Sequence, residues 1–193
     1  MSRPAVFLDR DGTLIEDVGY VDRLDRLQLY PWSLESVRLL RRAGYAVVVV
    51  TNQAGVARGF VREQMVRDVF ESIQQQLAAI DEQLDGHYYC PHLIDAPVES
   101  YRRQCSCHKP LPGMVEQAVA SLDLDVSQSY VVGDRWTDVQ LARSVGAKAV
   151  LVKTGYGVTQ LADPPPGETA DAVFDNLLEA VGWVLFQPIT SSS

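Results

Sequence analysis

The sequence predicts an α/β fold built on a doubly wound parallel sheet. Short apolar runs alternate along the chain with longer segments whose apolar residues recur at helical spacing. Several of these runs end in polar, turn-forming residues, as strands do at the ligand-binding edge of an open α/β sheet. With 193 residues and 47% hydrophobic composition, the chain can bury a sizeable core. We therefore expect one domain over residues 1–188 and a disordered tail at 189–193.

Strands are expected where the apolar runs are continuous, because a parallel strand in such a sheet is buried on both faces. The expected strands lie at 5–8, 45–50, 87–89, 130–132, 147–152 and 172–174. Helical patterns lie at 31–42, 62–84, 112–122, 139–145 and 176–186. The first helix has Ser33 as a candidate N-cap and Gly44 as a C-terminal stop, and it follows a loop or short hairpin at 15–29. Strands that alternate with helices imply right-handed crossovers and a Rossmann-like sheet with helices on both faces.

Charge and hydropathy disfavour several classes of function. The formal net charge is −8, from 17 Lys and Arg against 25 Asp and Glu, which disfavours binding to nucleic acid and to anionic membranes. No apolar run is long enough to span a bilayer, and the N-terminal residues lack the pattern of a signal peptide. We expect a cytoplasmic monomer whose partner is a small molecule.

The most informative motif is DRDGT at 9–13, which follows the first expected strand. Residues two apart in extended backbone face the same side, so Asp9 and Asp11 should share one pocket while Arg10 points away. An ordinary turn is the alternative, since Asp and Gly favour turns. The rest of the chain favours a paired-carboxylate site.

Polar side chains end three strands that would meet at one edge of this sheet. Those expected to converge are Asp9, Asp11, Thr51, Asn52, Asp134 and Asp138. Carboxylate oxygens of this kind suit Mg²⁺, with Asp9 and Asp134 as the best ligands. Lys109 is a compact cation that could balance Asp9 and a phosphoryl oxygen, although a single lysine is more often a solvated surface residue.

These residues resemble, in order and placement, the four motifs of the haloacid dehalogenase (HAD) superfamily of phosphatases and phosphotransferases. The matching residues are DRDGT at 9–13, Thr51, Lys109, and Gly133-Asp134 followed by Asp138. The resemblance implies that Asp9 attacks phosphorus to form an aspartyl-phosphate, and that Asp11 serves as the acid and then the base. It also implies that Mg²⁺ is held by the Asp9 side chain, the Asp11 carbonyl and Asp134. Phosphoryl oxygens would be held by Thr51, Lys109 and the N–H groups of the turn from Asp11 to Thr13, which includes Gly12.

All three cysteines fall within residues 90–107. An odd cysteine count in a cytosolic chain argues against disulfides, and a Cys₃His set is a regular tetrahedral zinc site. The predicted ligands are Cys90, His92, Cys105 and Cys107. Four protein ligands leave no open position, so this zinc would be structural and would stiffen the loop that ends at Lys109. The alternative is three small thiols beside a surface histidine, and His108 is a weaker competitor because its neighbour Cys107 makes joint chelation awkward.

Zinc-containing members without a large cap domain form a branch of the superfamily. The chain is most similar to the heptose 1,7-bisphosphate 7-phosphatases of this branch, because histidinol-phosphate phosphatases usually have a shorter loop before Cys105. The branch commonly has a substrate-recognising Arg just before the catalytic Lys, where this chain has His108. Arg58 and Arg135 are candidate replacements, though each is more often a surface residue. The residues expected to face the substrate are Gly12, Thr13, Asp17, Tyr20, Asn52, Gln53, Arg58, His108 and Arg135.

The segment at 14–33 is too short for a helical cap, so we expect a HAD core with a zinc-stapled loop and an open site. The predicted function is Mg²⁺-dependent hydrolysis of a phosphorylated sugar, with the 7-phosphate of heptose 1,7-bisphosphate first and histidinol phosphate or another small monoester as the alternative. A phosphomutase is disfavoured, because shielding an aspartyl-phosphate from water normally takes a lid. A non-catalytic, zinc-stabilised binding module is the alternative of a different class, and turnover separates the two.

Overall fold

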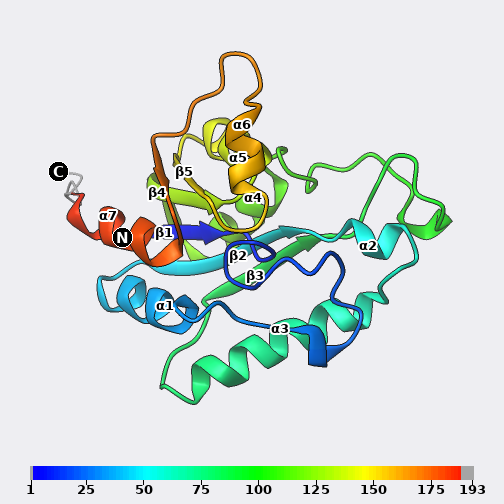
Figure 1. The fold of residues 1–193 in the computed structure, drawn as a ribbon, viewed down its shortest axis with the longest axis horizontal. Helices are drawn as coiled ribbons and strands as arrows, with labels where there is room; N and C mark the ends of the chain where they lie inside the picture. Colours follow the sequence, from blue (N-terminus) through cyan, green and yellow to red (C-terminus); the bar gives the residue numbers. More distant parts are fainter. Residues whose placement is uncertain (1, 188–193) are drawn as a thin grey trace.

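The computed structural model describes residues 2–187, which form a six-stranded sheet in which every pairing is parallel (Figure 1). The strand order is β3-β2-β1-β4-β5-β6. The bounds of the strands are β1 Arg3–Leu8, β2 Ala46–Asn52, β3 Gly86–Cys90, β4 Leu124–Gly133, β5 Lys148–Val152 and β6 Ala172–Phe174. The order reverses between β1 and β4, which is where ligands bind in doubly wound sheets. The predicted fold class is confirmed.

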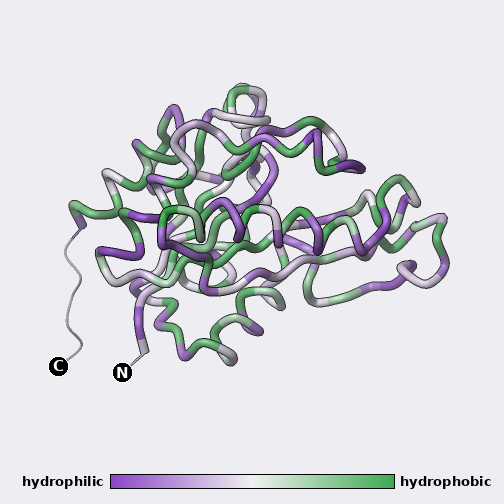
Figure 2. The backbone as a smooth tube through the Cα atoms, turned by 90° about the horizontal axis from the view of Figure 1, so that it is seen from below, coloured by the Kyte–Doolittle hydropathy of each residue, from purple (hydrophilic) through white to green (hydrophobic). Residues whose placement is uncertain are grey.

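Helices cover both faces of the sheet (Figure 1). One face packs against α1 (Ser33–Arg42), α3 (Glu63–Ala78) and α7 (Leu177–Phe186), and the other against α4 (Gly113–Leu122) and α5 (Trp136–Val145). Hydrophobic and hydrophilic stretches alternate along the helices in Figure 2, as expected when each helix buries one face. Both faces of β1 are buried, because Val6 and Leu8 belong to one core and Ala5 and Phe7 to the other.

Several element bounds differ from the prediction. The helix predicted at 62–84 ends at Ala78, because the Gln74 side chain binds both backbone groups of Leu84 and turns the chain back. Ser33 is not an N-cap; its hydroxyl donates to the Leu14 carbonyl at 2.6 Å, and the side chain lies inside the first turn. Two short helices were not predicted, α2 (Ala54–Ala57) and α6 (Gly157–Ala162). The tail predicted at 189–193 lies outside the described residues.

The two connections that could have carried a cap hold only single turns of 3₁₀ helix. Residues 9–32, between β1 and α1, contain Leu24–Arg26, and residues 91–112, between β3 and α4, contain Glu99–Tyr101. Within residues 2–187 the structure therefore shows no large cap over the carboxyl ends of the strands. No helix among these residues is long and apolar enough to cross a membrane.

Candidate active site

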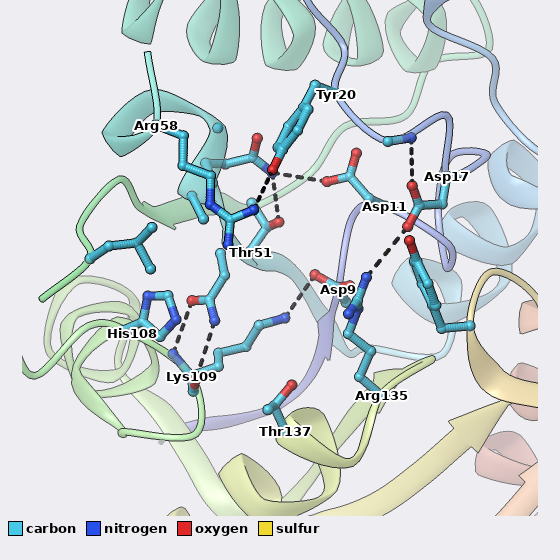
Figure 3. Close-up of a pocket in the computed structure, with 17 residues that line it drawn as sticks. Asp9, Asp11, Asp17, Tyr20, Thr51, Arg58, His108, Lys109, Arg135 and Thr137 are labelled. Carbon is cyan, nitrogen blue, oxygen red and sulfur yellow. Dashed lines mark hydrogen bonds and ion pairs between the residues drawn. The ribbon is translucent and has the colours of Figure 1, made fainter. Parts of the chain in front are cut away.

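A buried lysine joins Asp9, which follows β1, to Asp138 in the first turn of α5. Figure 3 shows the Lys109 side chain reaching Asp9. The Lys109 Nζ lies 2.7 Å from Asp9 Oδ1, 2.7 Å from Asp138 Oδ1 and 3.0 Å from the Val50 carbonyl oxygen. Asp9 is held at the sheet because its N–H donates to the Val132 carbonyl of β4. The three hydrogens of the ammonium are thus all used within the protein, which fixes Asp9 in one orientation.

The cluster is short of positive charge. Burial raises the pKa of Asp9 to about 6, although the Lys109 ammonium opposes this shift. Burial also raises the pKa of Asp134 to about 8, and the nearby Asp9 carboxylate adds to it. For Lys109, burial acts to lower the pKa, but Asp138 and Asp9 outweigh it and hold that pKa above its ordinary value. Three buried carboxyl groups face one ammonium, so a cation would relieve the burial of their charge.

Asp11 lies beside Asp9 on the wall of the same cavity, as predicted. Arg10 lies outside the cavity lining, yet its guanidinium turns back and binds both carboxylate oxygens of Asp11 at 3.0 Å. Gln53 donates to Asp11 at 2.9 Å and to the Thr51 hydroxyl at 3.0 Å, and it accepts from Arg10. Sequence reasoning missed this use of Arg10, which holds the Asp11 side chain in place.

The loop after β5 packs directly on the DRDGT turn and on Asp134. The Tyr156 N–H donates to Asp134 Oδ2 at 2.7 Å, and the Thr154 hydroxyl donates to the Gly12 carbonyl at 2.5 Å. A Cβ on Gly155 would lie 2.2 Å from Asp134 Oδ2, and one on Gly12 would lie 2.3 Å from the same oxygen. Both positions also have positive φ, so glycine is required there for two reasons. No sequence pattern singled out this loop.

These side chains surround an open cavity of about 510 Å³. Its lining contains most of the residues predicted to act on or bind the substrate, namely Asp9, Asp11, Asp17, Tyr20, Thr51, Asn52, Gln53, Arg58, His108, Lys109 and Arg135. The lining also includes Thr137 and Tyr156, which were not predicted. The predicted residues that the structure keeps out of this lining are Gly12, Thr13 and Asp134.

Two of the three N–H groups predicted to face phosphoryl oxygens, those of Gly12 and Thr13, are bonded within the DRDGT turn. The Gly12 N–H donates to the Ile15 carbonyl at 2.8 Å, and the Thr13 N–H to the Arg10 carbonyl at 3.4 Å. These two N–H groups are therefore used within the turn, and Gly12 contacts the loop after β5 through its carbonyl rather than lining the cavity.

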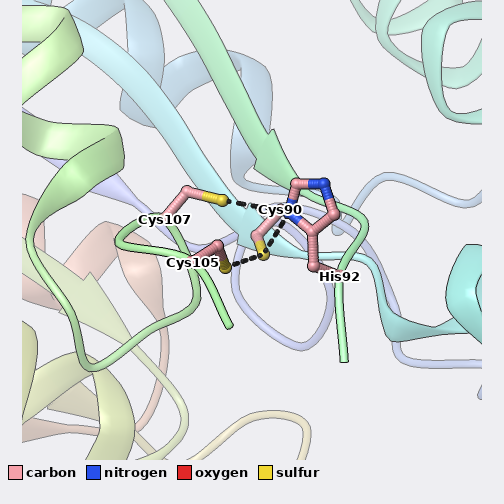
Figure 4. Close-up of side chains that lie close together, drawn as sticks. All are labelled: Cys90, His92, Cys105 and Cys107. Atoms are coloured by element: carbon pink, nitrogen blue, oxygen red, sulfur yellow. Dashed lines mark hydrogen bonds between the residues drawn. The ribbon is translucent and has the colours of Figure 1, made fainter. Parts of the chain in front are cut away.

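The cysteines and one histidine form a compact cluster beside this cavity (Figure 4). The Sγ atoms of Cys90 and Cys105 lie 3.6 Å apart, and His92 Nδ1 lies 3.7 Å from Cys90 Sγ and 3.4 Å from Cys107 Sγ. A tetrahedral zinc with Zn–S bonds of about 2.3 Å has sulfur–sulfur edges of about 3.8 Å, so this spacing fits the ion. The four predicted ligand atoms all lie within 4.8 Å of one another. His108 Nδ1 is 3.5 Å from Cys90 Sγ, but within residues 2–187 the His108 ring makes no hydrogen bond to Cys105 or Cys107.

The carboxylate group also fits a metal ion. One ligand oxygen each of Asp9, Asp134 and Asp138 lies within 4.8 Å of the others. Asp134 Oδ1 is buried without a hydrogen-bond partner among the described residues, whereas Asp138 is already bound to Lys109 and to the Arg135 N–H. Asp9 and Asp134 are therefore the side chains with oxygens to offer a hard divalent cation such as Mg²⁺.

Comparison with known proteins identifies the family. Residues 106–180 match the model of the HAD-hydrolase-like family. The chain is 43% identical over 180 residues to the D-glycero-beta-D-manno-heptose-1,7-bisphosphate 7-phosphatase of Escherichia coli K12, covering 92% of each protein. It is 45% identical over 160 residues to the enzyme of the same name from Yersinia pestis, covering 82% of this chain and 85% of that one.

Solved structures agree with this result. The D,D-heptose 1,7-bisphosphate phosphatase from B. bronchiseptica, complexed with magnesium and phosphate, superposes with a TM-score of 0.82 at 32% identity, covering 94% of this chain and 98% of that one. The enzyme of that name from Burkholderia thailandensis gives a TM-score of 0.69 at 26% identity, covering 96% of this chain and 100% of that one. The fold, the motif residues and the identity across nine-tenths of the chain lead to one conclusion: this chain belongs to the heptose-1,7-bisphosphate 7-phosphatase family of the HAD superfamily of phosphatases.

Proposed function

We propose that this chain is a Mg²⁺-dependent phosphatase that removes the 7-phosphate of D-glycero-D-manno-heptose 1,7-bisphosphate through an aspartyl-phosphate. The observation that carries the proposal is the buried Asp9–Lys109 pair at the cavity, with Asp11 on the same wall. A nucleophilic carboxylate needs a fixed orientation, and an acid or base needs to stand beside it. Relatives with 43–45% identity are named for this reaction.

Magnesium fits the carboxylate cluster, and Asp9 and Asp134 would hold it together with the Asp11 carbonyl. When bound, it supplies positive charge for phosphoryl oxygens and for the buried carboxylates. Asp134 Oδ1 is buried without a hydrogen-bond partner among the described residues, and carboxyl groups outnumber ammonium groups in the cluster. Both observations support this assignment.

The chemistry rests on side chains that the fold already places. An oxygen of Asp9 forms a bond to phosphorus while the bond from phosphorus to the sugar oxygen breaks, and Asp11 gives that oxygen its proton. Asp11 then takes a proton from a water molecule whose oxygen attacks the same phosphorus, which releases inorganic phosphate and restores Asp9. Lys109 stays bound to Asp9 throughout and balances its charge, while Thr51 and Gln53 border the space where phosphoryl oxygens would lie.

The cysteine cluster is proposed to bind a structural zinc through Cys90, His92, Cys105 and Cys107. Cys107 stands two residues before Lys109, so an ion there would fix the loop that carries the catalytic lysine. The distances of 3.4–3.7 Å among the ligand atoms support zinc over three unliganded thiols.

The test is phosphate release by purified protein with Mg²⁺ on both anomers of the heptose bisphosphate, beside histidinol phosphate. Phosphorus NMR of the product distinguishes loss of the 7-phosphate from loss of the 1-phosphate, and Asp9→Asn is the matched inactive control. We expect preference for a heptose bisphosphate and a 1-phosphate product. A preference for histidinol phosphate would move the substrate assignment, and no turnover of any ester with both metals bound would favour a binding module. Cytoplasmic location and a monomeric state stay predictions from the sequence.

A further inference from the structure

The proposed substrate carries two phosphates, and the catalytic cluster accounts for one. The second would sit elsewhere in the cavity, where it would need cationic or N–H donors that are free to turn toward it. The lining offers three Lys or Arg side chains, which are Arg58, Lys109 and Arg135. The contacts that each of these side chains already makes decide which one is available to bind the second phosphate. This inference rests on the proposed function.

Two of the three are already neutralised. Lys109 places its three donors on Asp9, Asp138 and the Val50 carbonyl and is buried. Arg135 lies 3.6 Å from Asp17 and 4.0 Å from Asp134, and its guanidinium stacks on the Tyr156 ring at 3.9 Å. A phosphate at Arg135 would have to compete with Asp17 for the guanidinium, and the Asp17 carboxylate beside it would repel the phosphate.

Arg58 has no such partner. Its guanidinium makes one hydrogen bond, from Nη1 to the Tyr20 hydroxyl at 2.9 Å, and within residues 2–187 no carboxylate lies within 4.0 Å of it. The backbone of Arg58 is fixed, because this residue caps the C-terminus of α2 and its N–H donates to the carbonyl of Ala54, the first residue of that helix. Arg58 therefore presents an unneutralised guanidinium, with most of its donors unused, to an open cavity.

Tyr20 is seated so that its hydroxyl adds a donor at the same place. Its ring lies against Gly55, where a Cβ would come within 2.6 Å of the ring, and it packs on Phe60 with ring centres 5.2 Å apart. Because the hydroxyl oxygen accepts from Arg58, its own proton is left to donate, and no acceptor for it is found among the described residues. Figure 3 shows the Tyr20 hydroxyl and the Arg58 guanidinium meeting over the cavity.

We propose that Arg58 and Tyr20 together bind the distal phosphate of the bisphosphate substrate and thereby set the preference for a bisphosphate over a monophosphate. The guanidinium would give a charge-assisted pair of hydrogen bonds, and the phenol a third. Arg135 serves a different purpose in this arrangement, since it holds Asp17 at the cavity wall.

The experiment compares kcat/KM for heptose 1,7-bisphosphate and for heptose 7-phosphate in four proteins. These are the wild type, Arg58→Gln, Arg135→Gln, and Arg62→Gln as a matched control with an exposed arginine outside the cavity. We expect Arg58→Gln to lower kcat/KM for the bisphosphate by about 10- to 100-fold, mainly through KM, and to lower that for the monophosphate by less than about 3-fold. Tyr20→Phe should lower the ratio of kcat/KM for the bisphosphate to kcat/KM for the monophosphate by about 3- to 10-fold.

Separate results overturn this inference and the proposed function. Equal losses on both substrates in Arg58→Gln, or a ratio that collapses in Arg135→Gln instead, would overturn the Arg58 assignment while wild-type turnover of the bisphosphate stands. Wild-type protein that hydrolyses neither heptose phosphate would overturn the proposed function itself, and the inference with it. The dissociation constant of the bisphosphate on Asp9→Asn and on Asp9→Asn/Arg58→Gln gives a readout without turnover, and an unchanged constant would also overturn the inference.

Discussion

The carboxylate–lysine cluster and the cysteine cluster lie beside the same cavity, yet they are built in different ways. Asp9 and Asp134 stand at the ends of paired strands, β1 and β4, whose register is set by the sheet. The cysteine cluster takes Cys90 from the end of β3 and its other members from the loop at 91–112, where one isolated bridge joins Leu93 and Arg102. The carboxylate–lysine cluster is therefore held by two paired strands, whereas the cysteine cluster is held by one strand and a loop.

The two clusters also differ in how their charges are balanced. Lys109 supplies a buried cation to Asp9 and Asp138 within the protein. Among residues 2–187 no Lys or Arg side chain is bonded to the three thiols, and burial raises the pKa of the Cys90 thiol, so a metal ion would be needed to hold that sulfur as a thiolate. We infer that the catalytic geometry is preorganised by the chain, whereas the loop that delivers Lys109 depends on an ion. The predictions below test this difference.

The largest effect is expected for Asp9→Asn. The amide cannot serve as the phosphoryl acceptor, so turnover should fall by at least about a thousand-fold. Steady-state phosphate release and the melting temperature check this, with the exposed Asp163→Asn as the control. The fold should survive, because removing a buried carboxylate also removes part of the cost of burying it. Appreciable residual activity would contradict the role of Asp9 as nucleophile.

Cys107→Ser should act on metal, stability and activity together. With one ligand lost, zinc content should fall and the melting temperature should drop by about 10 °C, since each kcal/mol shifts it by about 2–4 °C in a chain of this size. Gln104→Ser, an exposed change in the same loop, is the control. Metal analysis beside calorimetry decides the matter, because full zinc retention in Cys107→Ser would show that the cluster has been misassigned.

Gly155→Ala tests whether the loop after β5 supports the proposed magnesium site. The added Cβ would meet Asp134 Oδ2 at 2.2 Å and the Gly12 Cα at 2.6 Å, so Asp134 must move. The Mg²⁺ concentration for half-maximal activity should rise by about 10-fold, and Mg²⁺ should raise the melting temperature less than in the wild type. Gly146→Ala is a matched control, since its φ is also positive but no atom lies within 4 Å of the new Cβ. Equal behaviour of the two variants would show that backbone strain alone is responsible.

The predictability of each cluster follows from how it is built. Asp9, Thr51 and Asp134 could be predicted because they follow apolar runs, and parallel strands bring their carboxyl ends to one edge. The grouping of the three cysteines with His92 could be predicted because their spacing is local in sequence. The contacts of Thr154, Gly155 and Tyr156 could not, since they join a loop to residues 22 or more positions away through packing alone. The bonds from Arg10 to Asp11 were missed because alternation along a strand gives the direction of a side chain's base, not of a long, flexible end.

The smallest effect concerns the strand that leads to the cysteine cluster. Burial lowers the pKa of His87 in β3 to about 4, the Arg10 charge adds to this, and the ring stacks on Phe70 at 3.8 Å. Between pH 6.5 and pH 4, His87 binds a proton in the unfolded chain but not in the folded protein. The contribution of neutral His87 to the free energy of unfolding is therefore complete above pH 6.5 and is lost as pH falls toward 4. His87→Phe keeps the stacking and removes the titration. Its free energy of unfolding relative to wild type should therefore improve by about 2 kcal/mol between pH 7 and pH 4.5, measured by urea denaturation. A pH-independent difference would mean that His87 takes up its proton as readily in the folded protein as in the unfolded chain, and that this edge of the sheet is more open to water than the cluster at β1 and β4.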